Sequence, residues 1–173
     1  NRTFGETFVV PEAVISDIGG RVMGLNDPTV KMSKSYAHVR GHAIRILDEP
    51  AEIERTIRRS VTDSDSEIRF SDDPEKAGVN NLLGIYKVIT GESTEQVESD
   101  FAHARGYGDL KKRVAEVVID ALAPIRQRYE TLMEDVAELD RLLARGAEQA
   151  REVSEPKLDE MKRRVGLVLP RRS

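Results

Sequence analysis

The segment KMSKS at positions 31–35 contains two lysines and two serines within five residues. It follows the run Asn26–Thr29, in which Pro28 disfavours helix at Asp27, so we expect a loop here. Two ammonium groups three residues apart on such a loop can neutralise a polyanion, for example a chain of phosphates. A solvated basic loop without function is the alternative that these residues, taken alone, leave open.

The composition limits the classes of protein to which the chain can belong. Its 173 residues are 34% charged and only 5% aromatic, which favours a helical chain with little sheet core. The formal net charge of -4 excludes a uniformly basic nucleic-acid coat, although local basic patches stay open. A chain without cysteine forms no disulfide, zinc ribbon or iron–sulfur cluster. The apolar runs are too short to span a membrane, so we expect a cytoplasmic protein.

Two segments near the beginning of the chain have the composition of strands. Residues 7–10 (TFVV) are all β-branched or aromatic, and residues 19–25 (GGRVMGL) start with a glycine pair. Two strands alone leave an edge and a face uncovered, so they form no stable sheet. We therefore expect this region to end a larger sheet whose other strands lie upstream, and the chain to be a fragment.

From about residue 43 onward, apolar residues recur at helical spacing. We expect one helix to begin after Asp48, as its N-cap, with Pro50 in its first turn. A second helix should end at Gly91. A third should begin at Ser93, because its spacing from Gln96 fits a capping box.

The remaining residues have the longest helical patterns. One pattern starts near Asp109 and runs past residue 125. Two further helices are expected at about 135–145 and 147–165, separated near Gly146. The second half of the chain should therefore be a helical bundle with short connections.

The loop at 31–35 resembles the signature loop of class I aminoacyl-tRNA synthetases, and the residues around it narrow the match. Six blocks are similar to bacterial tryptophanyl-tRNA synthetases, occur in the same order and cover essentially the whole chain. They are GETFVVPEA, GGRVMGLNDPTVKMSKS, VTDSDSEIRF, GVNNLLGIYKVITGES, GYGDLKKRVAEVVIDALAPIRQRY and ELDRLLARGAEQA. A single pentapeptide is a weak motif, whereas six ordered blocks are specific.

The resemblance implies a mostly α chain, a helical bundle attached to the last strands of a Rossmann-type α/β catalytic domain whose remainder lies upstream. The end of that domain and the KMSKS loop would occupy residues 1–42. The helical anticodon-binding domain and the C-terminal helices would occupy residues 43–173. The family's other signature, an HxGH-type motif, has no match at His38, His42 or His103. We therefore expect the isolated chain to be inactive.

The resemblance also implies tryptophan–tRNA ligase activity. In that reaction ATP activates tryptophan to the adenylate with release of pyrophosphate, and the amino acid then passes to tRNA(Trp). The expected partners are ATP, tryptophan and tRNA(Trp), with Mg²⁺ carried by the nucleotide phosphates and no metal site of the chain's own. By resemblance the protein would be a homodimer.

The resemblance assigns the catalytic contacts to Lys34 first and Lys31 second. Main-chain groups of Val22 would meet the adenine, and Met32 would pack toward the adenosine. The full set of expected ATP-binding residues is Val22, Lys31, Met32, Ser33, Lys34 and Ser35.

Basic runs at residues 55–59, 111–113, 126–128 and 162–164 could each contact tRNA phosphates. The best of them follows GYG, where Tyr107 could stack on an unpaired anticodon base. The expected tRNA-binding residues are Tyr107, Lys111, Lys112 and Arg113. For any single run, a solvated helix face without function is the alternative.

Two other functions stay open at this point. A tyrosyl-tRNA synthetase is the first, because tryptophan specificity rests on resemblance and not on any pocket residue in the chain. A synthetase-derived helical module that only binds a partner protein is the second. Amino-acid-dependent pyrophosphate exchange by the intact enzyme separates the first alternative. The second would gain support if the gene encoded no nucleotide-binding half upstream.

Overall fold

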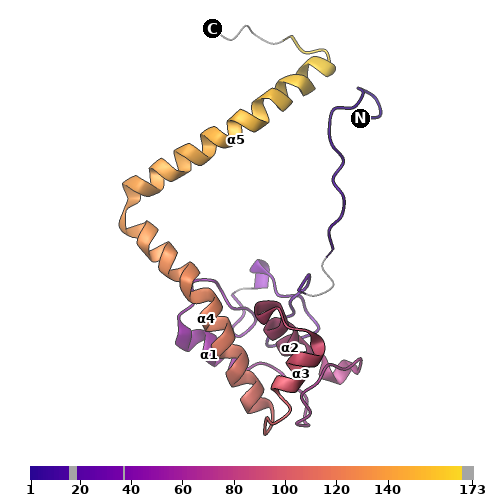
Figure 1. The fold of residues 1–173 in the computed structure, drawn as a ribbon, viewed down its shortest axis with the longest axis vertical. Coiled ribbons are helices and arrows are strands. Elements are labelled where there is room, and N and C mark those ends of the chain that lie inside the picture. Colours follow the sequence, from indigo (N-terminus) through magenta and orange to yellow (C-terminus); the bar gives the residue numbers. More distant parts are fainter. Residues whose placement is uncertain (16–18, 37, 169–173) are drawn as a thin grey trace. The chain divides into compact units, whose positions relative to one another are not determined.

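The structure is a computed structural model that describes residues 1–15, 19–36 and 38–168. The mostly helical fold expected from the sequence is confirmed (Figure 1). In chain order the helices are the 3₁₀ helix η1 (Lys34–Tyr36), α1 (Pro50–Arg58), the 3₁₀ helix η2 (Pro74–Lys76), α2 (Ala77–Thr90), α3 (Thr94–Asp100), α4 (Tyr107–Glu134) and α5 (Val136–Arg164). In the described ranges, no helix combines the length and the apolar content needed to cross a bilayer.

The two predicted strands are wrong. Residues 7–10 form no strand, and residues 19–25 contribute only an isolated antiparallel bridge from Met23 to Lys31. A strand needs a neighbour to satisfy its backbone groups. Here the N–H groups of Thr7 and Phe8 instead donate to Oδ1 of Asn1, each over 2.9 Å. The side chain of Asn1 therefore satisfies both N–H groups in this chain.

The chain divides into two compact units, residues 1–14 with 129–173 and residues 15–128. In the first unit, α5 is tied to the first residues of the chain. Lys157 Nζ donates to the Thr7 carbonyl over 2.9 Å, and Arg164 Nη1 donates to the Phe4 carbonyl over 3.1 Å. The predicted domain boundary between residues 42 and 43 stays a prediction.

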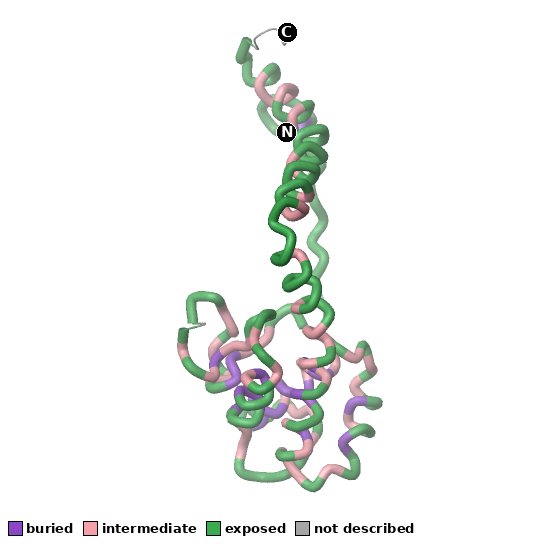
Figure 2. Tube along the Cα trace, turned by 90° about the vertical axis from the view of Figure 1, so that its left-hand side faces the viewer, coloured by how far each residue is buried: buried purple, intermediate pink, exposed green. Residues whose placement is uncertain are grey.

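The hydrophobic core of the second unit lies among α1, α2, α3 and α4, where the purple, buried residues of Figure 2 gather. Apolar residues of these helices supply most of it, as expected for amphipathic helices, and Leu25 and Phe101 join it from outside them. The buried apolar residues are Leu25, Ile53, Ile57, Val79, Leu82, Leu83, Tyr86, Val97, Phe101, Leu110, Val114, Ala115 and Val118.

The helix ends around residue 92 are confirmed, whereas the N-cap of α1 is wrong. Gly91 ends α2 with a left-handed φ of 72°, and Ser93 Oγ caps α3 by accepting from the Gln96 N–H over 3.2 Å. Glu49 rather than Asp48 precedes α1. The Asp48 carboxylate instead accepts from the Arg45 N–H over 2.9 Å, so it caps the preceding turn.

The predicted break near Gly146 is also wrong, because α5 continues through it from Val136 to Arg164. A glycine inside a helix costs only about 1 kcal/mol relative to alanine. The helix has an N-cap at Asp135, which accepts from the Glu138 N–H over 2.9 Å. One weak residue inside a long, capped helix is therefore not enough to end it.

Candidate functional site

The KMSKS loop begins at the end of a short antiparallel pairing in the second unit. The N–H of Gly24 donates to the Val30 carbonyl over 2.8 Å, and the N–H of Met32 donates to the Val22 carbonyl over 3.0 Å. Between them lies the bridge from Met23 to Lys31. The pairing fixes where Lys31 leaves the body of the unit.

The turn that joins the two paired segments is built by Asp27. Its carboxylate Oδ1 accepts from the hydroxyl of Thr29 over 2.6 Å and from the N–H of Thr29 over 2.9 Å. These hydrogen bonds from Thr29 favour the charged form and lower the pKa of the Asp27 carboxyl. The turn predicted from these residues is confirmed.

Asn81 on α2 clamps the pairing to the helical core. Its Oδ1 accepts from the Met23 N–H over 3.0 Å, and its Nδ2 donates to the Met23 carbonyl over 2.9 Å. Leu25, the residue after Gly24, is 1% exposed, and its carbonyl accepts from the Val61 N–H over 2.8 Å. The base of the loop is therefore anchored to α2 and to the segment after α1.

The two lysines of the loop are exposed, and in the described ranges neither ammonium makes a hydrogen bond or an ion pair. Lys34 starts η1, which the hydrogen bond from the Tyr36 N–H to the Ser33 carbonyl closes over 3.2 Å. Ser35 is exposed in the same turn. A rigid base thus presents two unpaired cations, an arrangement suited to an anionic ligand.

Met32 and Val22 lie deeper than the lysines. The side chain of Met32 is partly buried and packs against the core. Val22 lines a cavity of about 230 Å³, together with Met23 on the same segment and Asn81 and Gly84 on α2. The six expected ATP-binding residues are brought together on the paired segments and the loop that follows them.

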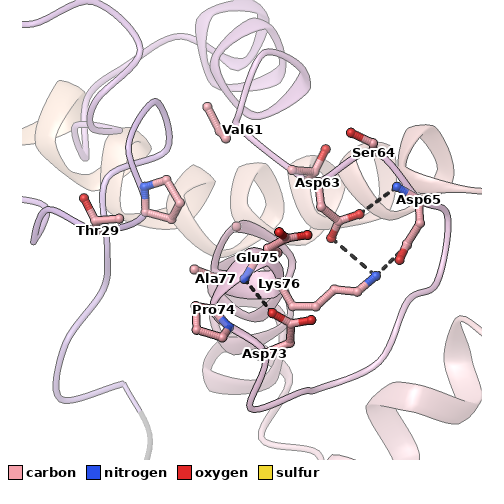
Figure 3. Close-up of a pocket in the computed structure, with 13 residues that line it drawn as sticks. Thr29, Val61, Asp63, Ser64, Asp65, Asp73, Pro74, Glu75, Lys76 and Ala77 are labelled. Atoms are coloured by element: carbon pink, nitrogen blue, oxygen red, sulfur yellow. Dashed lines mark hydrogen bonds and ion pairs between the residues drawn. The ribbon is translucent and has the colours of Figure 1, made fainter.

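A second cleft, of about 620 Å³, lies between the turn at Pro28 and Thr29, residues 61–65 and residues 73–78 (Figure 3). The ammonium of Lys76 is buried there, 2.5 Å from Oδ1 of Asp65 and 3.3 Å from Oδ2 of Asp63. This cleft was not predicted, because its charged residues come from an irregular connection that carries no periodic signal.

Tyr107 at the start of α4 completes the cluster around Lys76. Its hydroxyl lies 2.6 Å from Oδ1 of Asp63, 2.7 Å from Oδ1 of Asp65 and 3.0 Å from Nζ of Lys76. Burial and the two carboxylates raise the pKa of the Tyr107 hydroxyl. Burial opposes the charge on Lys76, but hydrogen bonds to Asp65, Tyr107 and Asp63 outweigh it and raise the pKa of Lys76. Hydrogen bonds from Lys76 and Tyr107 lower the pKa of Asp65.

The other predicted tRNA-binding residues follow Tyr107 on α4. Lys111 is partly buried and donates from Nζ to the Ser60 carbonyl over 2.8 Å, and burial lowers the pKa of its ammonium. Lys112 and Arg113 are exposed, with Arg113 paired to Glu116 over 3.3 Å. Tyr107, Lys111 and Arg113 therefore have structural contacts, and Lys112 and Arg113 are the two that are exposed.

The family model of the class I tRNA synthetases for tryptophan and tyrosine (W and Y) matches residues 1–123, well over half of the chain. The chain belongs to this family. The resemblance inferred from the six sequence blocks is thereby confirmed. The KMSKS loop described above lies within the matched residues.

Curated members of the class I family match along nearly the whole chain. The tryptophan–tRNA ligase of Wolinella succinogenes is 44% identical over 168 residues, which cover 97% of this chain and 50% of the relative. That of Caldanaerobacter subterraneus is 46% identical over 169 residues, which cover 98% and 50%. The chain therefore spans about half the length of the curated relatives it matches.

Solved structures of the family superpose on the chain as well. Tryptophanyl-tRNA synthetase from Mycoplasma pneumoniae matches with a TM-score of 0.83 and 28% identity, covering 96% of this chain and 49% of that one. The enzyme from Campylobacter jejuni complexed with ADP and tryptophan matches with a TM-score of 0.64 and 28% identity, covering 96% and 50%.

The sequence did not predict the places of two residues beside the loop. Asn81 lies in α2 beside buried Leu82, and a polar residue next to an apolar stripe was the available signal. His42 is 3% exposed, although a histidine in a polar segment gives no indication of burial.

Proposed function

We propose that the protein to which this chain belongs is a tryptophan–tRNA ligase. It activates tryptophan with ATP to the adenylate, releases pyrophosphate and transfers the amino acid to tRNA(Trp). The observation that carries the proposal is the 44% to 46% identity to tryptophan–tRNA ligases over nearly the whole chain. This chain would supply the loop that binds the phosphates and the helices that bind tRNA.

The chemistry explains why the loop carries ammonium groups. The carboxylate of tryptophan attacks the α-phosphorus of ATP while the bond to pyrophosphate breaks, so negative charge gathers on the leaving group. The nucleophile is already an anion, and this step needs no general base. It needs positioning and neutralisation of charge. Exposed, unpaired ammonium groups at the end of an anchored pairing meet that need.

Within the loop we assign the transition-state contact to Lys34 and a supporting contact to Lys31. Hydroxyl or backbone groups of Ser33 and Ser35 would hold phosphate oxygens. Val22 would face the adenine with its main chain, and the cavity of about 230 Å³ that it lines supports this assignment. The side chain of Met32 would reach the adenosine from its place against the core.

Mg²⁺ would enter on the phosphates of ATP and neutralise part of their charge. In the described ranges, no three acidic or histidine side chains are grouped to hold a metal ion. Mg²⁺ usually keeps several of its waters and is bound by one or two carboxylates together with substrate phosphates.

The partners of the whole protein follow from the same proposal. They are ATP, tryptophan and tRNA(Trp), and the protein would act as a homodimer in the cytoplasm. Tyr107, Lys111, Lys112 and Arg113 are the proposed tRNA contacts. The exposure of Lys112 and Arg113 supports their part of this assignment most directly.

The test is amino-acid-dependent exchange of pyrophosphate into ATP by the full-length protein. We expect exchange with tryptophan and none above background with tyrosine. The reverse would establish a tyrosyl-tRNA synthetase, which the family model also covers. No exchange with either amino acid would favour a synthetase-derived interaction module and overturn the proposal.

A further inference from the structure

His42 is the most enclosed polar residue beside the KMSKS loop. It is only 3% exposed, and its Nδ1 lies 3.0 Å from Oδ1 of Asn26. The main chain adds a second hydrogen bond at the same point, from the Leu25 N–H to the His42 carbonyl over 3.0 Å. Leu25, Asn26 and His42 form what we call the neck of the loop, where the chain leaves the core and returns to it.

The imidazole also packs between two parts of the loop. A Cβ on Gly24 would lie 2.5 Å from Cε1 of His42, so the main chain of the paired segment lies directly against the ring. The ring of Tyr36 lies 5.5 Å from that of His42, centroid to centroid, at an angle of 49°. Tyr36 ends η1, the turn that Lys34 starts. The His42 ring thus links the paired segment to the turn that carries Lys34.

The hydrogen bonding of the His42 ring argues against a role in packing alone. Oδ1 of Asn26 can only accept, so Nδ1 of His42 carries the proton. Nε2 is buried and has no hydrogen-bond partner in the described ranges. An unpaired buried nitrogen is costly, and an apolar residue such as leucine would fill the space without that cost. Packing alone therefore does not explain a histidine at this position.

We propose that His42 is a positioning residue, which holds Lys34 in place for its contact with the phosphates of ATP. It acts through Tyr36 and the neck and touches no substrate. The proposal deepens the proposed function and rests on it for the role of Lys34. Misplacing a reacting group by about 1 Å can lower a rate about a hundredfold. A neck that holds the loop in place can therefore affect the rate of tryptophan activation.

The first test measures tryptophan-dependent pyrophosphate exchange by the full-length protein carrying His42→Leu. We expect kcat to fall about ten- to a hundredfold while the KM for tryptophan stays unchanged. In a Lys34→Ala background the same substitution should cause no further loss, because its effect passes through Lys34. A destabilised fold without this coupling would lower both backgrounds by the same factor.

The second test measures how accessible the loop is to a protease and does not depend on activity. Limited trypsin digestion, followed by mass spectrometry, reports cleavage after Lys31 and Lys34. We expect cleavage at these two sites to be about tenfold faster in the His42→Leu protein, because the loop opens more often. The matched control is His38→Asn, a change at an exposed histidine of the same loop, which should retain wild-type cleavage and kcat.

If His42→Leu does not fold, Tyr36→Leu carries both tests, because Tyr36 is 50% exposed and its ring is the link to η1. Wild-type cleavage rates in a folded variant, or a full additional loss of kcat in the Lys34→Ala background, would overturn the positioning role. A wild-type protein without tryptophan-dependent exchange would overturn the proposed function instead. In that case the trypsin result still decides whether His42 orders the loop.

Discussion

At the scale of single residues, the sharpest feature is the pair of unpaired ammonium groups on the KMSKS loop. Lys34→Ala in the full-length protein should lower the rate of tryptophan activation about a hundred- to a thousandfold, comparable to losing one preorganised oxyanion donor. Tryptophan affinity should hardly change, and ATP affinity should fall less than the rate, because the contact strengthens as charge builds on pyrophosphate. Single-turnover kinetics of adenylate formation measures all three.

The conservative variant sharpens this prediction. Lys34→Arg should rescue poorly, because a planar guanidinium fork does not replace a compact ammonium in a closing loop. A Lys34→Ala enzyme with near-normal turnover and only a raised KM for ATP would contradict the prediction. Lys34 would then bind the ground state, and the transition-state role would pass to Lys31.

The Lys76 cluster gives a prediction of pH dependence. The pKa of Asp65 lies below its ordinary value of 3.8, since Lys76 and then Tyr107 donate to its carboxylate. A carboxyl with a lowered folded-state pKa stabilises the fold above its ordinary pKa, and this stabilisation is lost as the pH falls through the folded-state pKa. Between about pH 4 and pH 2 the free energy of unfolding should therefore fall more steeply in the wild type than in Asp65→Asn.

Urea unfolding at a series of pH values measures that slope. Asp72→Asn, a change at an exposed carboxylate on the same connection, is the matched control and should keep the wild-type slope. Equal slopes in the wild type and in Asp65→Asn would show that the cluster contributes nothing to acid sensitivity.

At the scale of elements, two neighbouring asparagines of α2 clamp different segments in the same way. Asn81 makes two hydrogen bonds to the main chain of Met23, and Asn80 makes two to the main chain of Ser71, over 2.6 and 3.1 Å. Removing either amide leaves a main-chain N–H and carbonyl without their partners, at a cost of about 1–3 kcal/mol.

The two variants should therefore differ in function but not in stability. We expect Asn81→Ala and Asn80→Ala to lower the free energy of unfolding by similar amounts. Only Asn81→Ala should also lower kcat for tryptophan activation, because Met23 is bridged to Lys31 at the base of the loop. Unfolding curves and pyrophosphate-exchange kinetics on both proteins test this prediction. An equal loss of kcat in both variants would show that it follows from lower stability and not from a change at the base of the loop.

The elements also show what the sequence could predict. The C-terminal end of α2 and the N-terminal end of α3 were predictable, because Gly91 and Ser93 act locally. Gly91 adopts a left-handed φ, and Ser93 caps α3 with its side chain. The break near Gly146 was wrong because the rest of a long helix outweighs one unfavourable residue. Strands at residues 7–10 and 19–25 could not be decided locally, since a strand depends on a partner segment.

The candidate site also contains residues that the sequence could predict and residues that it could not. The loop residues were found because the motif is contiguous and its chemistry can be read from residue type. Asn81 and His42 act on segments 58 and 16 positions away in the chain, at Met23 and Asn26. A periodic pattern does not specify which distant segments such side chains contact, so only the fold shows these pairs.

At the scale of the whole molecule, the start of α4 is where tRNA binding can be tested. Lys111 is engaged with Ser60, so its removal would confuse stability with binding. Lys112 and Arg113 are exposed, but Arg113 also pairs with Glu116 and interacts with Tyr86, so unfolding curves accompany their double substitution. Lys112→Ala with Arg113→Ala should weaken binding of tRNA(Trp) and reduce the slope of log affinity against log salt by about 1 per lost phosphate contact.

Two variants of Tyr107 are needed to separate the role of its ring from that of its hydroxyl, because the hydroxyl is hydrogen-bonded within the Lys76 cluster. Tyr107→Phe keeps the ring and removes those hydrogen bonds, so it should lower stability and leave tRNA affinity unchanged. Tyr107→Leu removes the ring as well. If the ring stacks on an anticodon base, only the second variant should weaken tRNA binding, by about 1–3 kcal/mol.

The matched control for the charge prediction lies on α5, where Lys162→Ala with Arg163→Ala removes the same two charge types. Filter binding of tRNA(Trp) across a range of salt concentrations, together with pyrophosphate exchange, measures every variant. We expect the α5 pair to keep the wild-type salt slope and both pairs to keep wild-type adenylate formation, because neither lies on the KMSKS loop. A wild-type slope in the α4 pair combined with a reduced slope in the α5 pair would move the tRNA contact to α5.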